Sequence, residues 1–192
     1  MRLLALDLGT SCGFAILKDG KFGSGTKKLR VDKKAFGSRF LDFRNWLLKM
    51  IALYDVQEVY FERVYGHSGT EAAHIYGGLM YTLATVCLEL NLKCVGFTVQ
   101  MIKKFMTGKG NATKEEMIAA TESRGFRPKT DDEADAISIM LLALNFLTSK
   151  NKNVQISKGG SFQGLKESGS PSPRTFLASD FFSEVDHAKN LQ

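Results

Sequence analysis

The sequence predicts an α/β fold in which a mixed five-stranded sheet carries helices on both faces. Three observations support this class. Three short strand-like segments follow one another at the N-terminus, helix-like and strand-like segments then alternate, and the last predicted helix is apolar nearly all round. Because such a helix must be buried on most sides, it is expected to lie against the sheet as one of its covering layers.

The first three strands are predicted from a buried run and two turn signals. Residues 2–8 are nearly all apolar, which is typical of a strand buried on both faces. Residues 9–13 form a glycine-containing turn into a second strand at 14–17. The pair Asp19-Gly20 is a hairpin signal, so a third, antiparallel strand is predicted over about 21–29.

The rest of the ordered chain alternates between segments with the periodicity of a helix and segments with the periodicity of a strand. Apolar residues recur at steps of three and four over 33–54, which predicts an amphipathic helix. Capping boxes at Thr113-x-x-Glu116 and Thr130-x-x-Glu133 mark the starts of two later helices. The remaining expected elements are strands at 56–62 and 93–97 and helices at 70–91, 99–106, 113–124 and 131–148.

Length and composition indicate one domain and a tail. The 192 residues suit a single domain at 1–150, and the glycine-, proline- and serine-rich segment 151–192 is predicted to be disordered. The chain has 44% hydrophobic residues and no apolar run of about 20, so no membrane segment is expected. The net charge of +6 is compatible with a polyanionic partner.

The cysteines and histidines exclude several site chemistries. Cys12, Cys87 and Cys94 are odd in number and lack CxxC spacing, so neither a disulfide framework nor a zinc site is predicted, and a reducing cytoplasm fits best. The only histidines are at 67, 74 and 187, and no G-x-S-x-G elbow occurs.

Four acids occupy unusual positions. Asp7 and Glu62 each end a predicted strand, while Asp132 and Asp135 lie three apart at the start of an apolar helix and so share one face. Carboxylates are rarely buried unless they are paired or bind metal. Taken singly, Asp7 could instead bond the following turn, Glu62 could be an exposed strand end, and acids at a helix start could serve the dipole, as we expect for Asp131 and Glu133.

Together the four acids predict a metal site. A cluster of this kind repels itself without cations, and Mg²⁺, with Mn²⁺ as a substitute, prefers oxygen ligands. Two ions about 3.5 to 4 Å apart can activate water and stabilise the leaving oxygen of a phosphodiester. Metal-assisted hydrolysis of phosphodiesters is therefore the predicted chemistry.

These segments resemble RuvC-type Holliday junction resolvases in order and spacing over about residues 1–148. The similar segments are the strands at 4–10 and 59–64, the basic segment with glycines at 97–114, and the acidic helix start at 132–136. The resemblance implies an RNase H-like fold, a homodimer, two-metal hydrolysis and paired nicks across a four-way junction. It makes the metal ligands Asp7, Glu62, Asp132 and Asp135.

The resemblance also assigns DNA contacts. Lys114 is implied near the scissile phosphate, and Tyr65 matches a position where relatives usually carry a phenylalanine near the junction centre. A tyrosine could equally stack on a base. By spacing alone, the lysines around Gly108 and Gly110 would suit a helix C-cap with solvated side chains, but the resemblance favours DNA binding by Lys103, Lys104, Lys109 and Lys114.

Departures from the family leave other readings open. Residues 66–70 lack the lysines of cellular resolvases, and the 42-residue tail is longer than the family needs. Such departures leave open a phage origin and activity on several kinds of branched DNA. A catalytically inactive junction-binding protein is one alternative, against which the complete acid set argues. A sugar-kinase or actin-like ATPase, suggested by residues 7–10, would need about twice this length.

The helix at 70–91 is the expected dimer interface. It carries more apolar surface than one sheet face needs, and Gly77 and Gly78 would let a partner backbone approach closely. The alternative is that this helix packs only within its own domain, with the glycines fitting against the sheet. The apolar residues in question are Ala72, Ala73, Ile75, Leu79, Leu83, Val86, Cys87 and Leu90.

Overall fold

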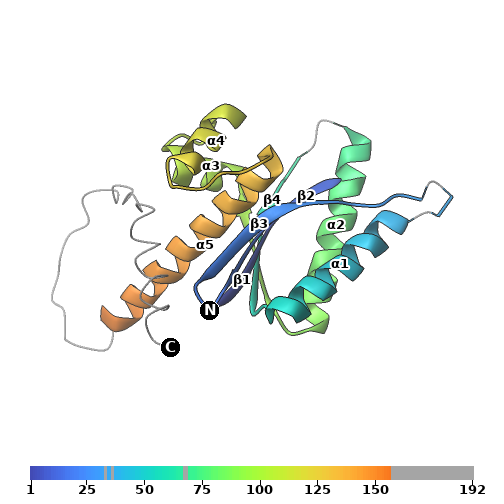
Figure 1. Ribbon diagram of the computed structural model, residues 1–192, viewed down its shortest axis with the longest axis horizontal. Helices are drawn as coiled ribbons and strands as arrows, with labels where there is room; N and C mark the ends of the chain where they lie inside the picture. The colour runs from blue at the N-terminus through green and yellow to red at the C-terminus, as the bar shows by residue number, and fades with distance from the viewer. Residues whose placement is uncertain (33, 36, 67–68, 157–192) are drawn as a thin grey trace.

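A five-stranded sheet with the order β3-β2-β1-β4-β5 forms the centre of the protein. The structure, a computed structural model, describes residues 1–32, 34, 35, 37–66 and 69–156. In Figure 1, helices α1 and α2 lie on one face of the sheet, and α3, α4 and α5 lie on the other. This is the predicted mixed sheet with helices on both faces.

The strands are close to those expected from the sequence. β1 pairs antiparallel with β2, which pairs antiparallel with β3, while β4 is parallel to both β1 and β5. The hairpin between β2 and β3 turns at Asp19 and Gly20, whose φ angles of 49° and 80° suit the predicted turn. The strands are β1 Arg2–Asp7, β2 Ser11–Lys18, β3 Lys21–Lys28, β4 Glu58–Arg63 and β5 Lys93–Thr98.

Alternate residues of the central strands enter two separate cores. Leu3 and Ala5 of β1 pack on the α5 side, whereas Leu4 and Leu6 pack on the side of α1 and α2. A strand places successive side chains on opposite faces, so the continuous apolar run is explained by burial on both. The same alternation decides which way the acid at the end of β1 points.

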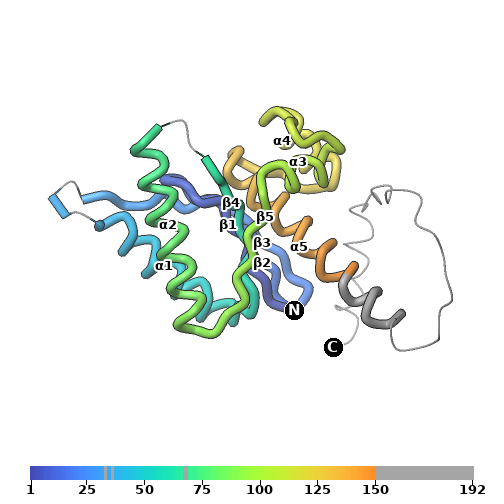
Figure 2. The backbone as a smooth tube through the Cα atoms, turned by 180° about the vertical axis from the view of Figure 1, so that it is seen from behind, coloured from blue at the N-terminus to red at the C-terminus, as the bar shows by residue number. Residues whose placement is uncertain are grey.

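The helices cover these two cores as separate layers. Figure 2, seen from behind, shows α5 running along one face of the sheet while α1 and α2 pack together on the other. The side chains of α5 from 136 to 143 are buried, as its all-apolar sequence predicts. The helices are α1 Ser38–Tyr54, α2 Thr70–Glu89, α3 Val99–Thr107, α4 Lys114–Glu122 and α5 Asp131–Ile156.

Some helices begin or end at other residues than the sequence predicts, in two cases next to a residue with a positive φ. The first helix was expected from residue 33, but α1 begins at Ser38 because Gly37 adopts a left-handed φ of 87°. The second ends at Glu89, shortly before Asn91 turns with a φ of 52°. The last continues past residue 148 to Ile156, so the prediction of a disordered tail over 151–192 is wrong for 151–156, and its remainder lies outside the described residues.

Among the described residues, no helix is long and apolar enough to span a bilayer. All three cysteines are free thiols, in agreement with the absence of a predicted disulfide framework.

Gly13 allows the start of α5 to lie directly on the sheet. It stands opposite Asp7 in the register of β1 and β2 and faces α5. A Cβ added at Gly13 would overlap the backbone carbonyl of Asp132 and lie 3.3 Å from the Ala136 side chain. A glycine at this position therefore sets how closely the acidic end of α5 approaches the end of β1.

We predict that Gly13→Ala lowers the free energy of unfolding by about 1 to 3 kcal/mol, because backbone rather than a flexible side chain must move. Urea unfolding would measure the loss. Gly23→Ala in β3 is the matched control, since its Cβ would meet only the Ile16 side chain at 3.4 Å. Equal stability of the two variants would contradict the close contact with α5.

Candidate active site

The strand alternation directs Asp7 and Glu62 to the same face of the sheet. Asp7 follows Leu3 and Ala5 in the two-residue period, and Glu62 follows Tyr60, all of which face α5. β1 and β4 are parallel neighbours, so their carboxyl ends meet at one edge. The two strand-end acids are thereby brought under the N-terminal end of α5, as predicted.

Burial and mutual repulsion raise the pKa values of three carboxyl groups. Desolvation, followed by repulsion from Glu62 and Asp135, raises the pKa of Asp7 well above its usual range. Desolvation and Asp135 raise the pKa of Glu62 to about 7. The pKa of Asp135 rises to about 6, mainly through desolvation and the charge of Asp131. These shifts mark a group of acids held together at a cost, which is typical of functional sites.

Asp132 completes the group from the first turn of α5. Its charge contributes to the raised pKa values of both Asp7 and Asp135. Within the described residues, however, no three His, Cys, Asp or Glu side chains are gathered tightly enough to form a ready-made metal site. The four predicted ligands are therefore close enough for their charges to influence pKa values within the group, but they are not arranged as a preformed metal site.

A small cavity of about 190 Å³ lies between the acids and the basic segment. Glu62 and Asp135 line it together with Lys103 and Lys114. Lys103 lowers the pKa values of both carboxyl groups, which opposes the effect of burial. A cavity lined by carboxylates and ammonium groups is suited to a phosphodiester and its counterions.

Lys114 forms an ion pair with Asp131, with 2.6 Å between Nζ and Oδ2. Asp131 lines the same cavity and is therefore more than the dipole-complementing acid expected from the sequence. Its side chain is 42% exposed and that of Lys114 is 73% exposed, so the pair contributes little to stability. Such a pair can open when a phosphate competes for the lysine.

Glu133, also expected only to complement the helix dipole, connects α5 to the edge strand β3. It is 6% exposed and accepts a hydrogen bond from the Ser24 hydroxyl at 2.7 Å and another from the Lys129 backbone N–H at 2.8 Å. Of the predicted capping box, the half in which Thr130 accepts from the Glu133 N–H is present. The partner at β3 is far away in sequence, so no local signal could reveal it.

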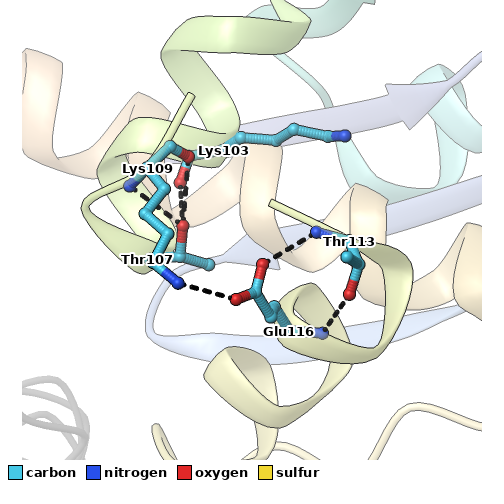
Figure 3. A network of polar contacts seen from close by, with 5 residues as sticks. All are labelled: Lys103, Thr107, Lys109, Thr113 and Glu116. Carbon is cyan, nitrogen blue, oxygen red and sulfur yellow. Dashed lines mark hydrogen bonds and ion pairs between the residues drawn. The ribbon is translucent and has the colours of Figure 1, made fainter. Parts of the chain in front are cut away.

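The other predicted DNA-binding lysines lie outside the cavity. Lys109 pairs with Glu116 at 2.9 Å, and Glu116 also accepts from the Thr113 N–H in the predicted capping box at the start of α4. Figure 3 shows Lys103 extending away from this network. Lys104 is exposed on α3. The basic segment is thus divided into two lysines that line the cavity, Lys103 and Lys114, and two at its rim, Lys104 and Lys109.

Tyr65 lies just beyond the end of β4, where its side chain is 75% exposed. The Arg63 guanidinium lies 5.1 Å from the centre of its ring, a cation–π distance. An exposed aromatic ring of this kind could stack on a nucleobase, so the DNA contact implied for Tyr65 stays a prediction.

A sheet of this order with acids at the ends of two neighbouring strands and at a helix start defines an RNase H-like domain. The solved structure of Thermus thermophilus RuvC in complex with Holliday junction substrate is similar, with a TM-score of 0.62 and 19% identity over 72% of this chain and 90% of that chain. The yeast mitochondrial Holliday junction resolvase is similar with a TM-score of 0.53 and 13% identity over 72% and 75%. These likenesses establish the fold.

The family is shown by sequence. The family model described as crossover junction endodeoxyribonuclease RuvC matches residues 3–143. A protein of that name from Caldicellulosiruptor saccharolyticus is 26% identical over 151 residues, covering 73% of this chain and 90% of the relative. Another, from Hydrogenovibrio crunogenus, is 25% identical over 174 residues, covering 84% and 97%. The chain belongs to the RuvC family.

The raised pKa values predict how stability depends on pH without metal. The folded-state pKa values of Glu62 and Asp135 exceed the ordinary values of 4.5 and 3.8 that apply to the unfolded chain, so folding takes up protons, and stability falls as pH rises from about 4 to 7. Glu62→Gln should therefore stabilise the metal-free protein by about 1 to 3 kcal/mol at pH 8 and much less at pH 5.

Thermal and urea unfolding at the two pH values would measure this difference. Glu122→Gln is the control, since Glu122 is an exposed carboxylate on α4. A stabilisation by Glu62→Gln that is the same at pH 5 and pH 8 would contradict the proposed charge repulsion.

Proposed function

We propose that this protein is a structure-selective endodeoxyribonuclease that cuts branched DNA, notably four-way Holliday junctions. The observation that carries the proposal is the group of acids with raised pKa values that faces the N-terminal end of α5 beside Lys103 and Lys114. Membership of the RuvC family supports it, because matched relatives are named crossover junction endodeoxyribonucleases and a similar structure contains a Holliday junction substrate.

The donor set fits Mg²⁺, with Mn²⁺ as a substitute. The donor atoms are all carboxylate oxygens, from Asp7, Glu62, Asp132 and Asp135. A bound cation would relieve the repulsion between these groups, which favours its binding. Two bound ions would supply an activated water and stabilisation of the leaving oxygen. The alternation of side chains along β1 and β4, which turns Asp7 and Glu62 toward the start of α5, supports this assignment.

The basic side chains take the phosphate backbone. In the proposed complex Lys114 exchanges Asp131 for the scissile phosphate, where charge develops during the reaction. Lys103 lies beside Glu62 and Asp135 and offsets their charge as the DNA enters. Lys104 and Lys109 at the rim bind neighbouring phosphates, and Tyr65 stacks on a base near the branch point.

The decisive experiment is cleavage of four-way, three-way, flap and linear duplex DNA with and without Mg²⁺. We expect the wild-type protein to cut branched DNA, and Asp7→Asn to lower the rate by at least about 100-fold while junction binding persists. The variant removes charge from the acid group but leaves the basic surface unchanged. Cleavage rates and gel-shift affinities are the measurements.

The matched control is Asp55→Asn, because Asp55 is an exposed aspartate with a left-handed φ of 52°, which asparagine tolerates. This control should cut as fast as wild type. Binding without cutting by the wild-type protein would support the inactive junction-binding alternative. Equal rates for wild type and Asp7→Asn would reject the assignment of Asp7 as a ligand.

We further propose that the protein acts as a two-fold dimer through the outward face of α2. Of the residues expected at this interface, Leu79, Leu83, Val86 and Cys87 are buried in the protein's own core, and Gly78 fits against the Phe40 ring of α1. The outward stripe is instead formed, at steps of three and four, by the partly exposed Gly77 and the exposed Tyr81, Ala84 and Leu88.

This stripe has the properties of a self-association surface. Tyr81 and Leu88 are 70% and 82% exposed, and a Cβ at Gly77 would meet nothing within 4 Å. Two such helices could pack closely at Gly77 and cover both large side chains. The two-fold symmetry would place two acid groups on equivalent strands of a four-way junction.

Leu88→Glu is therefore predicted to shift the protein to a monomer and to uncouple the paired nicks, because it buries a charge in the proposed interface. Light scattering at micromolar concentration and a cleavage assay with both strands labelled would test this. Leu53→Glu on α1, where the leucine is 67% exposed, should change neither result. A wild-type monomer in the presence of junction DNA would overturn the dimer while leaving the nuclease proposal intact.

A further inference from the structure

Tyr76 joins helix α2 to the end of the strand that carries Glu62. Its hydroxyl accepts a hydrogen bond from the Val64 backbone N–H at 2.9 Å and donates one to the Glu62 backbone carbonyl, also at 2.9 Å. The residue is 6% exposed and packs in the core between the sheet and α2. One side chain thus holds the backbone on both sides of Arg63.

The position of this contact follows from the pairing of β4. The register between β1 and β4 ends at Leu6 opposite Phe61, whereas the register between β4 and β5 continues to Arg63 opposite Thr98. Beyond Phe61 the strand is therefore held from one side only. The Tyr76 hydroxyl supplies both an acceptor and a donor to this stretch, much as a neighbouring strand would.

The residues fixed by this contact are those that the proposed function uses. The Glu62 side chain faces the acids of α5, and Arg63 contacts Tyr65. A rotation of the peptide between Glu62 and Arg63 would redirect both side chains, and the two hydrogen bonds of Tyr76 resist that rotation. Burial strengthens this restraint, because a buried backbone group left without a hydrogen-bond partner is destabilising.

We propose that Tyr76 is a positioning residue, whose hydroxyl holds the backbone at Glu62 so that this carboxylate can bind divalent cations in register with the acids of α5. Tyr76 acts from the opposite face of the sheet and touches neither ion nor DNA. The inference rests on the proposed function for its effect on cleavage, but its effect on ion binding can be measured without DNA.

The variant Tyr76→Phe removes the hydroxyl and keeps the ring that packs in the core. Tyr60→Phe is the matched control. Tyr60 is fully buried on β4, the strand that carries Glu62, and its hydroxyl donates to Glu58 at 2.6 Å, at the other end of that strand. Mn²⁺ binding to the DNA-free proteins by calorimetry, junction affinity, thermal stability, and single-turnover cleavage at a series of Mg²⁺ concentrations are compared for both.

Tyr76→Phe should weaken Mn²⁺ binding and raise the half-saturating Mg²⁺ concentration by about 10-fold to 100-fold, with junction affinity unchanged. Tyr60→Phe should alter thermal stability alone. In a Glu62→Gln background, Tyr76→Phe should have little further effect on Mn²⁺ binding, because the two residues act in one chain of contacts.

Loss of thermal stability in Tyr76→Phe with an unchanged Mn²⁺ affinity would overturn the proposal and leave Tyr76 a residue of the core. Equal effects of Tyr76→Phe with and without Glu62→Gln would overturn it as well. Should the wild-type protein bind Mn²⁺ but cut no DNA, the proposed function would fail while the calorimetric comparison still decided the role of Tyr76.

Discussion

The contact between the first turn of α5 and the end of the β1–β2 hairpin determines where the acids lie. Gly13 removes the side chain that would keep the Asp132 backbone away from the sheet, and the two-residue period of β1 turns Asp7 toward the gap that remains. The carboxyl groups then share a desolvated space in which each raises the pKa of another. Folding without cations therefore works against this repulsion, which the apolar remainder of α5 offsets by its burial between helices and sheet.

Most of the fold and the gathering of the four acids in one place could be predicted from the sequence, because both depend on local period and position, whereas the role of these acids as metal ligands stays a prediction. The run at 2–8 and the nearly all-apolar segment at 136–144 are both typical of buried elements. A carboxylate at the end or start of such an element is therefore expected to lie close to the neighbouring buried elements. The resemblance to a family supplied the RNase H-like fold, whereas the order of the strands in the sheet comes from the structure. Family membership is now shown over residues 3–143, whereas the ions, the dimer, the disorder of the tail beyond residue 156 and a phage origin remain predictions.

What the sequence could not show are contacts between distant segments. Glu133 carries the same charge as its neighbours Asp132 and Asp131, yet it bonds Ser24 on an edge strand more than 100 residues away. The apolar residues of α2 could not be divided between an inner and an outer face, because nearly every position of that helix is apolar or small. Tyr76 gave no signal, since two hydrogen bonds to backbone groups leave no pattern in side-chain types.

The ion pair between Lys114 and Asp131 has a consequence for the ionic-strength dependence of DNA binding. A lysine that neutralises a DNA phosphate normally releases a condensed counterion, and each such release steepens the fall of affinity with added salt. Lys114 already has an anionic partner within the protein, so in the proposed complex its transfer to DNA would leave Asp131 to attract a cation from solution. One ion would be released and another taken up. In the proposed reaction Lys114 would therefore add almost nothing to the salt sensitivity of binding, in contrast to an unpaired lysine at the rim.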